Sequence, residues 1–150
     1  MATKAIQPET ITEKLIGRWE YVGQKLGALA EETPEHKFEY RPVDGVRSFA
    51  DVIRHVAFWN CYVADRARGK KGDCTANELP KEKFSTKKQI LNALERSNAD
   101  ALGALKAHTS GLTPEIVEML VTLIEHNCEH YGQLVVYARL NGIVPPASRG

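Results

Sequence analysis

The sequence predicts an all-α protein folded as a bundle of four helices. Four separate stretches carry apolar residues at alternating steps of three and four, which is the period of a helix with one buried face. A residue typical of helix N-caps stands at the start of each stretch. No dipeptide typical of a β-hairpin turn separates two alternating runs, so strands are not expected. Helices of this kind bury their apolar faces against one another, which predicts the bundle.

The first predicted helix covers residues 10–32, and the second covers about 49–68. Thr10 and Ser48 are the capping residues, and each is followed three residues later by an acidic side chain, as in a capping box. The connection between the helices contains Pro42, which interrupts the helical period. The buried stripe of the first helix is expected to consist of Ile11, Leu15, Trp19, Val22, Leu26 and Leu29.

The third and fourth helices follow a polar, glycine-rich stretch, residues 69–80, that we expect to form a surface loop. Thr86 is the expected N-cap of the third helix, and Gly111 is expected to end it. The Thr113-Pro114 pair then suits the N-cap and first position of a long fourth helix, which should run to about residue 141.

The composition is that of an ordinary water-soluble protein. The 150 residues have the length of one domain and contain no internal repeat, so we predict a single domain over residues 1–150. Hydrophobic residues make up 43% and charged residues 26%, which argues against a disordered or fibrous chain. A net charge of +1 provides no broad basic surface, so nucleic acid is not an expected partner.

The expected location is cytoplasmic, with no membrane partner. No apolar run approaches the roughly 20 residues of a membrane span, and the first residues lack the apolar segment of a secretory signal. The three cysteines form no CxxC pair, so we expect free thiols rather than disulfides or a cysteine zinc site.

Two of the five histidines, His126 and His130, lie four residues apart on the fourth predicted helix. This spacing leaves the two rings about 40° apart on one face, with Cβ atoms roughly 5 to 6 Å apart, so both can reach one ion. The spacing alone is weak evidence. Both positions, however, fall in line with Met119, Leu123 and Tyr137 on the expected inward face, where an unpaired imidazole would be costly to bury.

His55 is a third histidine on an apolar helix face, among aliphatic and aromatic neighbours. Taken alone, such a histidine is more often a core residue hydrogen-bonded to a carbonyl group. Three of them on two helices of one bundle also suit a shared metal site, because bundles often bind metals between facing helices. The residues alone leave both interpretations open.

A site of three neutral imidazoles would suit zinc, nickel, iron or copper, whereas calcium and magnesium prefer oxygen. Zinc or nickel is the first expectation and iron the next. Three protein ligands leave a coordination position open, which is typical of a reactive rather than a structural zinc site. A water bound there would become more acidic, and a bound thiol would lose its proton.

Several side chains lie near these histidines in the helical register. Gln133 nearly eclipses His126, and Glu129 lies between the two histidines in angle, so either could support a ligand, although a polar position at the edge of the stripe is more frequent. Trp59 and Tyr62 could wall a substrate pocket, but aromatic residues at helical spacing are more often core. We expect no function for the remaining histidines and cysteines: His36, His108, Cys61, Cys74 and Cys128.

Two segments resemble the DinB/YfiT-like superfamily of metalloenzymes. They are FEYRPVDGVRSFADVIRHVAFWN, around the first histidine, and EHNCEHYGQLVVYARLNGIVPP, around the last two. The resemblance implies an up-and-down four-helix bundle over essentially the whole chain, with the metal triad at His55, His126 and His130. Many members carry another histidine directly after the third ligand, where this chain has Tyr131. Members often form homodimers, an assembly that the sequence neither supports nor excludes.

The resemblance also implies a chemistry. The better understood relatives are transferases and isomerases that use mycothiol, bacillithiol or glutathione, and their metal is thought to present the sulfur as a thiolate. The first hypothesis is therefore a metal-dependent S-transferase, whose partners are a small-molecule thiol and an electrophile.

Two alternatives stay open. The first is metal-assisted hydrolysis with Glu129 or another carboxylate as base, although no helix carries the HExxH pattern that would place a glutamate beside the first ligand. The second is a stress-associated binding or dimerisation module whose metal has no catalytic role.

Overall fold

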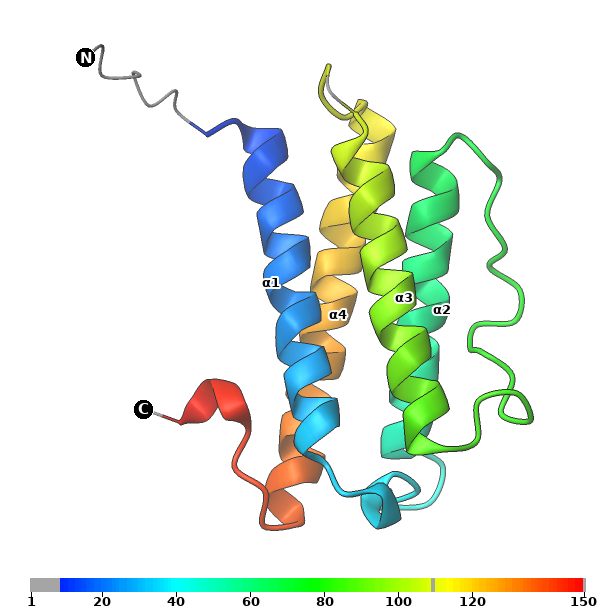
Figure 1. Ribbon diagram of the computed structural model, residues 1–150, viewed down its shortest axis with the longest axis vertical. Helices are drawn as coiled ribbons and strands as arrows, with labels where there is room; N and C mark the ends of the chain where they lie inside the picture. The colour runs from blue at the N-terminus through cyan, green and yellow to red at the C-terminus, as the bar shows by residue number, and fades with distance from the viewer. Residues whose placement is uncertain (1–8, 109, 150) are drawn as a thin grey trace.

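Four long helices form the body of the molecule in the computed structural model, which describes residues 9–108 and 110–149 (Figure 1). The described residues contain no β-strand, so the predicted all-α fold class is confirmed. The helices are α1 (Ile11–Glu32), α2 (Phe49–Ala67), α3 (Lys87–Lys106) and α4 (Pro114–Leu140), and short 3-10 turns lie at Glu35–Lys37 and Pro146–Ser148. None of the described helices has the length and apolarity needed to cross a membrane.

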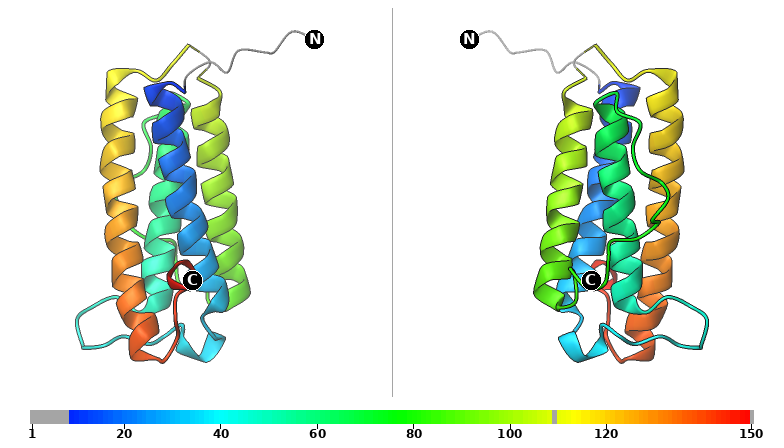
Figure 2. Two further views of the ribbon diagram at one scale, coloured as in Figure 1. Left: turned by 90° about the vertical axis from the view of Figure 1, so that its left-hand side faces the viewer. Right: turned by 90° about the vertical axis from the view of Figure 1, so that its right-hand side faces the viewer.

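The four helices pack as a bundle, as expected, but consecutive helices do not alternate in direction throughout. In Figures 1 and 2, α1 and α4 run one way along the bundle, and α2 and α3 run the other way. The parallel neighbours α2 and α3 share the most extensive contact. α1 packs against α3 and α4, and α4 packs against α1 and α2, so neither outer helix makes its main contacts with its own neighbour in sequence. The up-and-down order that the resemblance implied is therefore broken at one step.

The cause of this break is the long connection of residues 68–86, which returns the chain along α2 to the end of the bundle where α2 began (Figure 1). An extended residue advances roughly 3.3 Å, whereas a helical residue rises only about 1.5 Å, so a connection of this length can run past the whole helix. Four-helix bundles accommodate long crossovers of this kind.

The start of α2, which positions His55, is held by a buried capping box. The Ser48 hydroxyl accepts a hydrogen bond from the Asp51 N–H, and the Asp51 carboxylate accepts one from the Ser48 N–H at 3.0 Å. Burial alone would raise the pKa of Asp51, but hydrogen bonds from Arg54 and Ser48 outweigh it and lower this pKa to about 2. The side chains of Thr10, Thr86 and Thr113 cap the other three helices, as predicted.

The predicted end of the third helix was wrong. The helix ends at Lys106, and Gly111, expected to end it, lies in the following connection with a φ of +94°. A tertiary contact explains the earlier end, because the His108 ring donates from Nε2 to the Ala67 carbonyl oxygen at 2.7 Å, at the last turn of α2.

The core consists of two apolar clusters with a polar layer between them. In α2, one cluster extends to Ala57 and the other begins at Val63. Between the clusters lie Asn60, Ser97 and Asn127, one each from α2, α3 and α4, and each is at most 6% exposed. Asn60 donates to the Ser97 hydroxyl at 3.3 Å, which satisfies part of the layer internally. The histidines of α4 lie at this level, between Leu123 of one cluster and Leu134 of the other.

We expect Ser48→Ala to destabilise the protein by about 1 to 2 kcal/mol, because it removes a capping hydroxyl that is fully buried and also donates to Asp51. The matched change Thr10→Ala removes the same motif from an exposed position and should cost about 0.5 to 1 kcal/mol. Urea unfolding of both variants measures the difference. Equal losses of stability in the two variants would show that the buried Ser48 cap stabilises the protein no more than the exposed Thr10 cap.

Candidate metal centre

His55 of α2 and the α4 pair His126 and His130 converge on one point between the two helices. Their ligand nitrogens all lie within 4.8 Å of one another, and Nε2 of His55 is 2.8 Å from Nε2 of His126. The ring centroids are 4.5 to 4.8 Å apart. Within the described part of the chain, no other group of three histidine, cysteine, aspartate or glutamate side chains comes together in this way.

The second nitrogen of each ring faces a neutral oxygen atom. The acceptors for His55, His126 and His130 are, in this order, the Asn77 backbone oxygen at 2.6 Å, Asn127 Oδ1 at 3.1 Å and Gln133 Oε1 at 3.0 Å. An oxygen of this kind accepts and does not donate, so each Nδ1 carries the proton and each Nε2 keeps a free lone pair. The three lone pairs therefore belong to the three nitrogens that meet.

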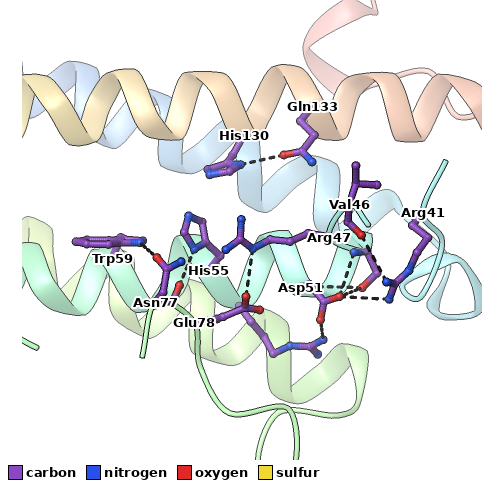
Figure 3. A network of polar contacts seen from close by, with 12 residues as sticks. Arg41, Val46, Arg47, Asp51, His55, Trp59, Asn77, Glu78, His130 and Gln133 are labelled. Carbon is purple, nitrogen blue, oxygen red and sulfur yellow. Dashed lines mark hydrogen bonds and ion pairs between the residues drawn. The ribbon is translucent and has the colours of Figure 1, made fainter. Parts of the chain in front are cut away.

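A chain of hydrogen bonds holds His130 in this orientation, and Figure 3 shows its first link, between His130 and Gln133. Gln133 accepts from His130 through its oxygen and donates from Nε2 to the Tyr137 hydroxyl at 2.8 Å. Tyr137 then donates to the Arg47 carbonyl oxygen at 3.0 Å. Because Tyr137 uses the NH2 group of Gln133, the amide must turn its oxygen toward His130. The sequence pattern had favoured an edge position for Gln133, and the structure places it behind a histidine instead.

The connection between α2 and α3 supplies the support for His55. Asn77 adopts a φ of +61°, a left-handed conformation that asparagine tolerates better than most residues. Its backbone oxygen accepts from His55, and its side-chain oxygen accepts from Trp59 Nε1 at 3.1 Å (Figure 3). Asn77 was not predicted from the sequence, because a residue in an aperiodic loop gives no signal apart from its residue type.

The other neighbours named from the sequence lie at different distances from the centre. Trp59 is half-buried, and its ring centroid is 6.3 Å from that of His55 and 6.1 Å from that of His126, so it both borders the histidines and packs on the core. Tyr62 contacts Trp59 rather than the histidines. Glu129 is exposed, and its negative charge acts to raise the pKa values of His126 and His130.

Burial keeps the three rings neutral. Burial is the largest cause that lowers the pKa of His55 to about 4, and the hydrogen bond to Asn77 opposes it only in part. Burial likewise lowers the pKa values of His126 and His130, and the nearby positive charge of Arg47 lowers all three. Neutral imidazole is the form that binds a metal, so the rings are in the ligand form at neutral pH.

The comparison with known families agrees with this geometry. A family model described as the DinB superfamily matches residues 18–134, a stretch that includes all three histidines. The chain belongs to the DinB superfamily. None of the curated proteins matches the chain.

The donor set of this DinB superfamily chain suits a metal cation. Two Nε2 lone pairs face each other across 2.8 Å with no proton available between them, because the protons are on Nδ1. Such lone pairs repel, and a cation at their meeting point would replace the repulsion with attraction. The nitrogen ligands favour a transition metal over calcium or magnesium. The cluster could therefore hold a metal ion.

We expect the metal-free protein to lose stability as the pH falls from about 6.5 to about 4. In this range the unfolded state takes up a proton at His55, whereas the folded state, with its pKa lowered to about 4, does not, so the unfolded state binds more protons. The stability is regained as the pH rises through the same window. Urea midpoints in the presence of EDTA, measured for wild type and His55→Gln, test this. The variant should show the smaller pH dependence, and identical pH profiles would rule out this role for His55.

Proposed function

We propose that the chain binds a divalent transition metal through His55, His126 and His130 and uses it in thiol-dependent S-transfer. Zinc and nickel are the first candidates and iron is the next. The observation that carries the proposal is the convergence of three Nε2 lone pairs whose Nδ1 protons are already engaged by oxygen acceptors.

His55, His126 and His130 would hold the metal, and a metal bound there would lower the pKa of a small thiol at its open coordination position. The thiolate sulfur would then form a bond to an electrophilic carbon, and the leaving group would depart with the bonding electrons. The residues of the chain prepare this position. Asn77, Asn127 and Gln133 hold each Nδ1 proton and so keep the opposite nitrogen free of protons. Trp59 borders the rings of His55 and His126 and would form one wall of this position.

Hydrolysis is the second candidate, and the geometry around Glu129 supports it less well. A general base must lie within hydrogen-bond reach of the water that it activates and must be oriented for it. Glu129 is exposed, and the described contacts include no hydrogen bond that would orient it toward the histidines. A module with a purely structural metal is the third candidate, because the histidines link α2 to α4.

Removal of any one of the three histidines should abolish stoichiometric metal binding. We expect protein purified without a histidine tag to take up about one Zn²⁺ or Ni²⁺ per chain, and His55→Ala and His130→Ala to lower the affinity at least tenfold, since each removes a direct ligand. His36→Ala removes an exposed histidine outside the cluster and serves as the matched control. Elemental analysis after equilibrium dialysis measures the metal. Unchanged metal content in His130→Ala would show that the proposed site is wrong.

The metal-loaded protein should conjugate a small thiol to 1-chloro-2,4-dinitrobenzene, with release of chloride. We expect the rate to disappear after chelation and in His126→Ala, because the thiolate depends on the metal, and to remain within about twofold in Glu129→Gln. Glutathione, bacillithiol and mycothiol are offered in parallel, and the absorbance of the conjugate is recorded.

A parallel assay with p-nitrophenyl acetate separates the alternatives. Ester hydrolysis that requires both the metal and Glu129, without conjugation, would favour the hydrolase. Metal-dependent stability without turnover in either assay would favour the structural module.

A further inference from the structure

Arg47 is a positively charged side chain beside the three histidines, and the S-transfer proposed above gives it no role. It directly precedes the N-cap of α2, and its carbonyl oxygen accepts the Tyr137 hydroxyl proton at 3.0 Å, so its backbone belongs to the support of the site. Figure 3 shows its guanidinium directed toward His55, on the side where Gln133 holds His130. Its side chain is 33% exposed, which leaves it accessible to a small molecule.

The guanidinium is only partly used by the protein. Its Nε donates to the Glu78 carboxylate at 3.2 Å. Across the described residues, no hydrogen bond involves its two terminal nitrogens. An arginine bound through Nε is held in direction and still presents donors suited to a carboxylate. Glu78 therefore orients the Arg47 guanidinium and leaves its terminal nitrogens free to donate to a ligand.

The charge balance around the histidines points to an anionic ligand. Each ring donates its Nδ1 proton to a neutral oxygen and binds a metal as neutral imidazole, so a divalent cation held by the three histidines would bring two positive charges close to Arg47. Glu78 offsets the charge of Arg47 itself, and within the described part of the chain the acidic side chain whose charge reaches the α4 histidines is the exposed Glu129. Two neighbouring positive groups repel each other unless an anion lies between them.

We propose that Arg47 is the anion-binding group of this site and that the thiol it selects carries a carboxylate. The inference rests on the proposed function, since the sulfur would occupy the position that the three histidines leave open. The carboxylate would then lie against the terminal nitrogens of Arg47. Arg47 is a specificity-determining residue in this arrangement, because it distinguishes an anionic thiol from a neutral thiol of the same size.

The test uses the full-length chain loaded with Co²⁺, whose sulfur-to-metal absorption band reports thiolate binding directly. The probes are 3-mercaptopropionate and 3-mercaptopropan-1-ol, which share a carbon chain and differ in charge. Wild type should bind the acid more tightly than the alcohol. Arg47→Gln should lower the affinity for the acid by about tenfold, which is the effect of one partly exposed charge-assisted hydrogen bond. The affinity for the alcohol should stay within about twofold of the wild-type value. Arg47→Lys, which keeps the charge, should recover part of the loss.

A second pair of variants separates ligand binding from a structural role. If Arg47 only fastens the connection of residues 68–86 through Glu78, then Glu78→Gln should reproduce Arg47→Gln and weaken both probes alike. If Arg47 binds the carboxylate, Glu78→Gln should keep or increase the affinity for the acid, because it removes a competing carboxylate. Equal affinity of wild type for the two probes, or equal losses of both in Arg47→Gln, would overturn the proposal.

A thiol-independent measurement keeps the two proposals distinguishable. If neither probe gives the absorption band, thiol binding at the metal has failed, and calorimetric titration with propionate then tests Arg47 alone. Propionate binding that is lost in Arg47→Gln and kept in Glu78→Gln would support the anion site without the thiol chemistry. Propionate affinity that does not depend on Arg47 would reject the anion site as well.

Discussion

Three imidazoles can direct their Nε2 atoms at one buried point only if each has another partner for its Nδ1 proton. The rest of the site follows from this constraint. The partners come from three different places: the backbone of a loop at Asn77, a buried layer of polar side chains at Asn127, and the next turn of the same helix at Gln133. All three acceptors are uncharged, so they orient the rings without giving them a proton, and burial keeps the rings neutral.

The helix order contributes directly to the centre. Because α2 and α3 run parallel, the chain between them must travel back along the bundle, and residues 68–86 do so past His55. This path brings Asn77 onto His55 and Glu78 onto Arg47. A short hairpin between antiparallel helices would have placed no loop residue there. The parallel arrangement of α2 and α3 is therefore what places loop residues where they can hold His55 and Arg47 in position.

The polar layer explains how the bundle tolerates so many polar groups in its interior. Asn60 and Ser97 satisfy each other in part, and Asn127 gives its oxygen to His126. Each of the apolar clusters on either side contributes large, fully buried side chains, such as Phe49 in one and Trp19 in the other. Burial of this apolar surface offsets the cost of the layer, so the bundle can hold polar groups at mid-height that would be unfavourable in a uniform core.

The sequence by itself determined the local features: the apolar stripes, the caps at Thr10 and Ser48, and the histidine pair of α4, because these depend on spacing within one helix. With the family resemblance, it also named His55 as the third member. The tertiary structure alone decided that α2 runs parallel to α3, that α3 stops before Gly111, and that Asn77 and Arg47 lie at the histidines. Those features arise from contacts between distant segments, and periodicity within a helix carries no information about them.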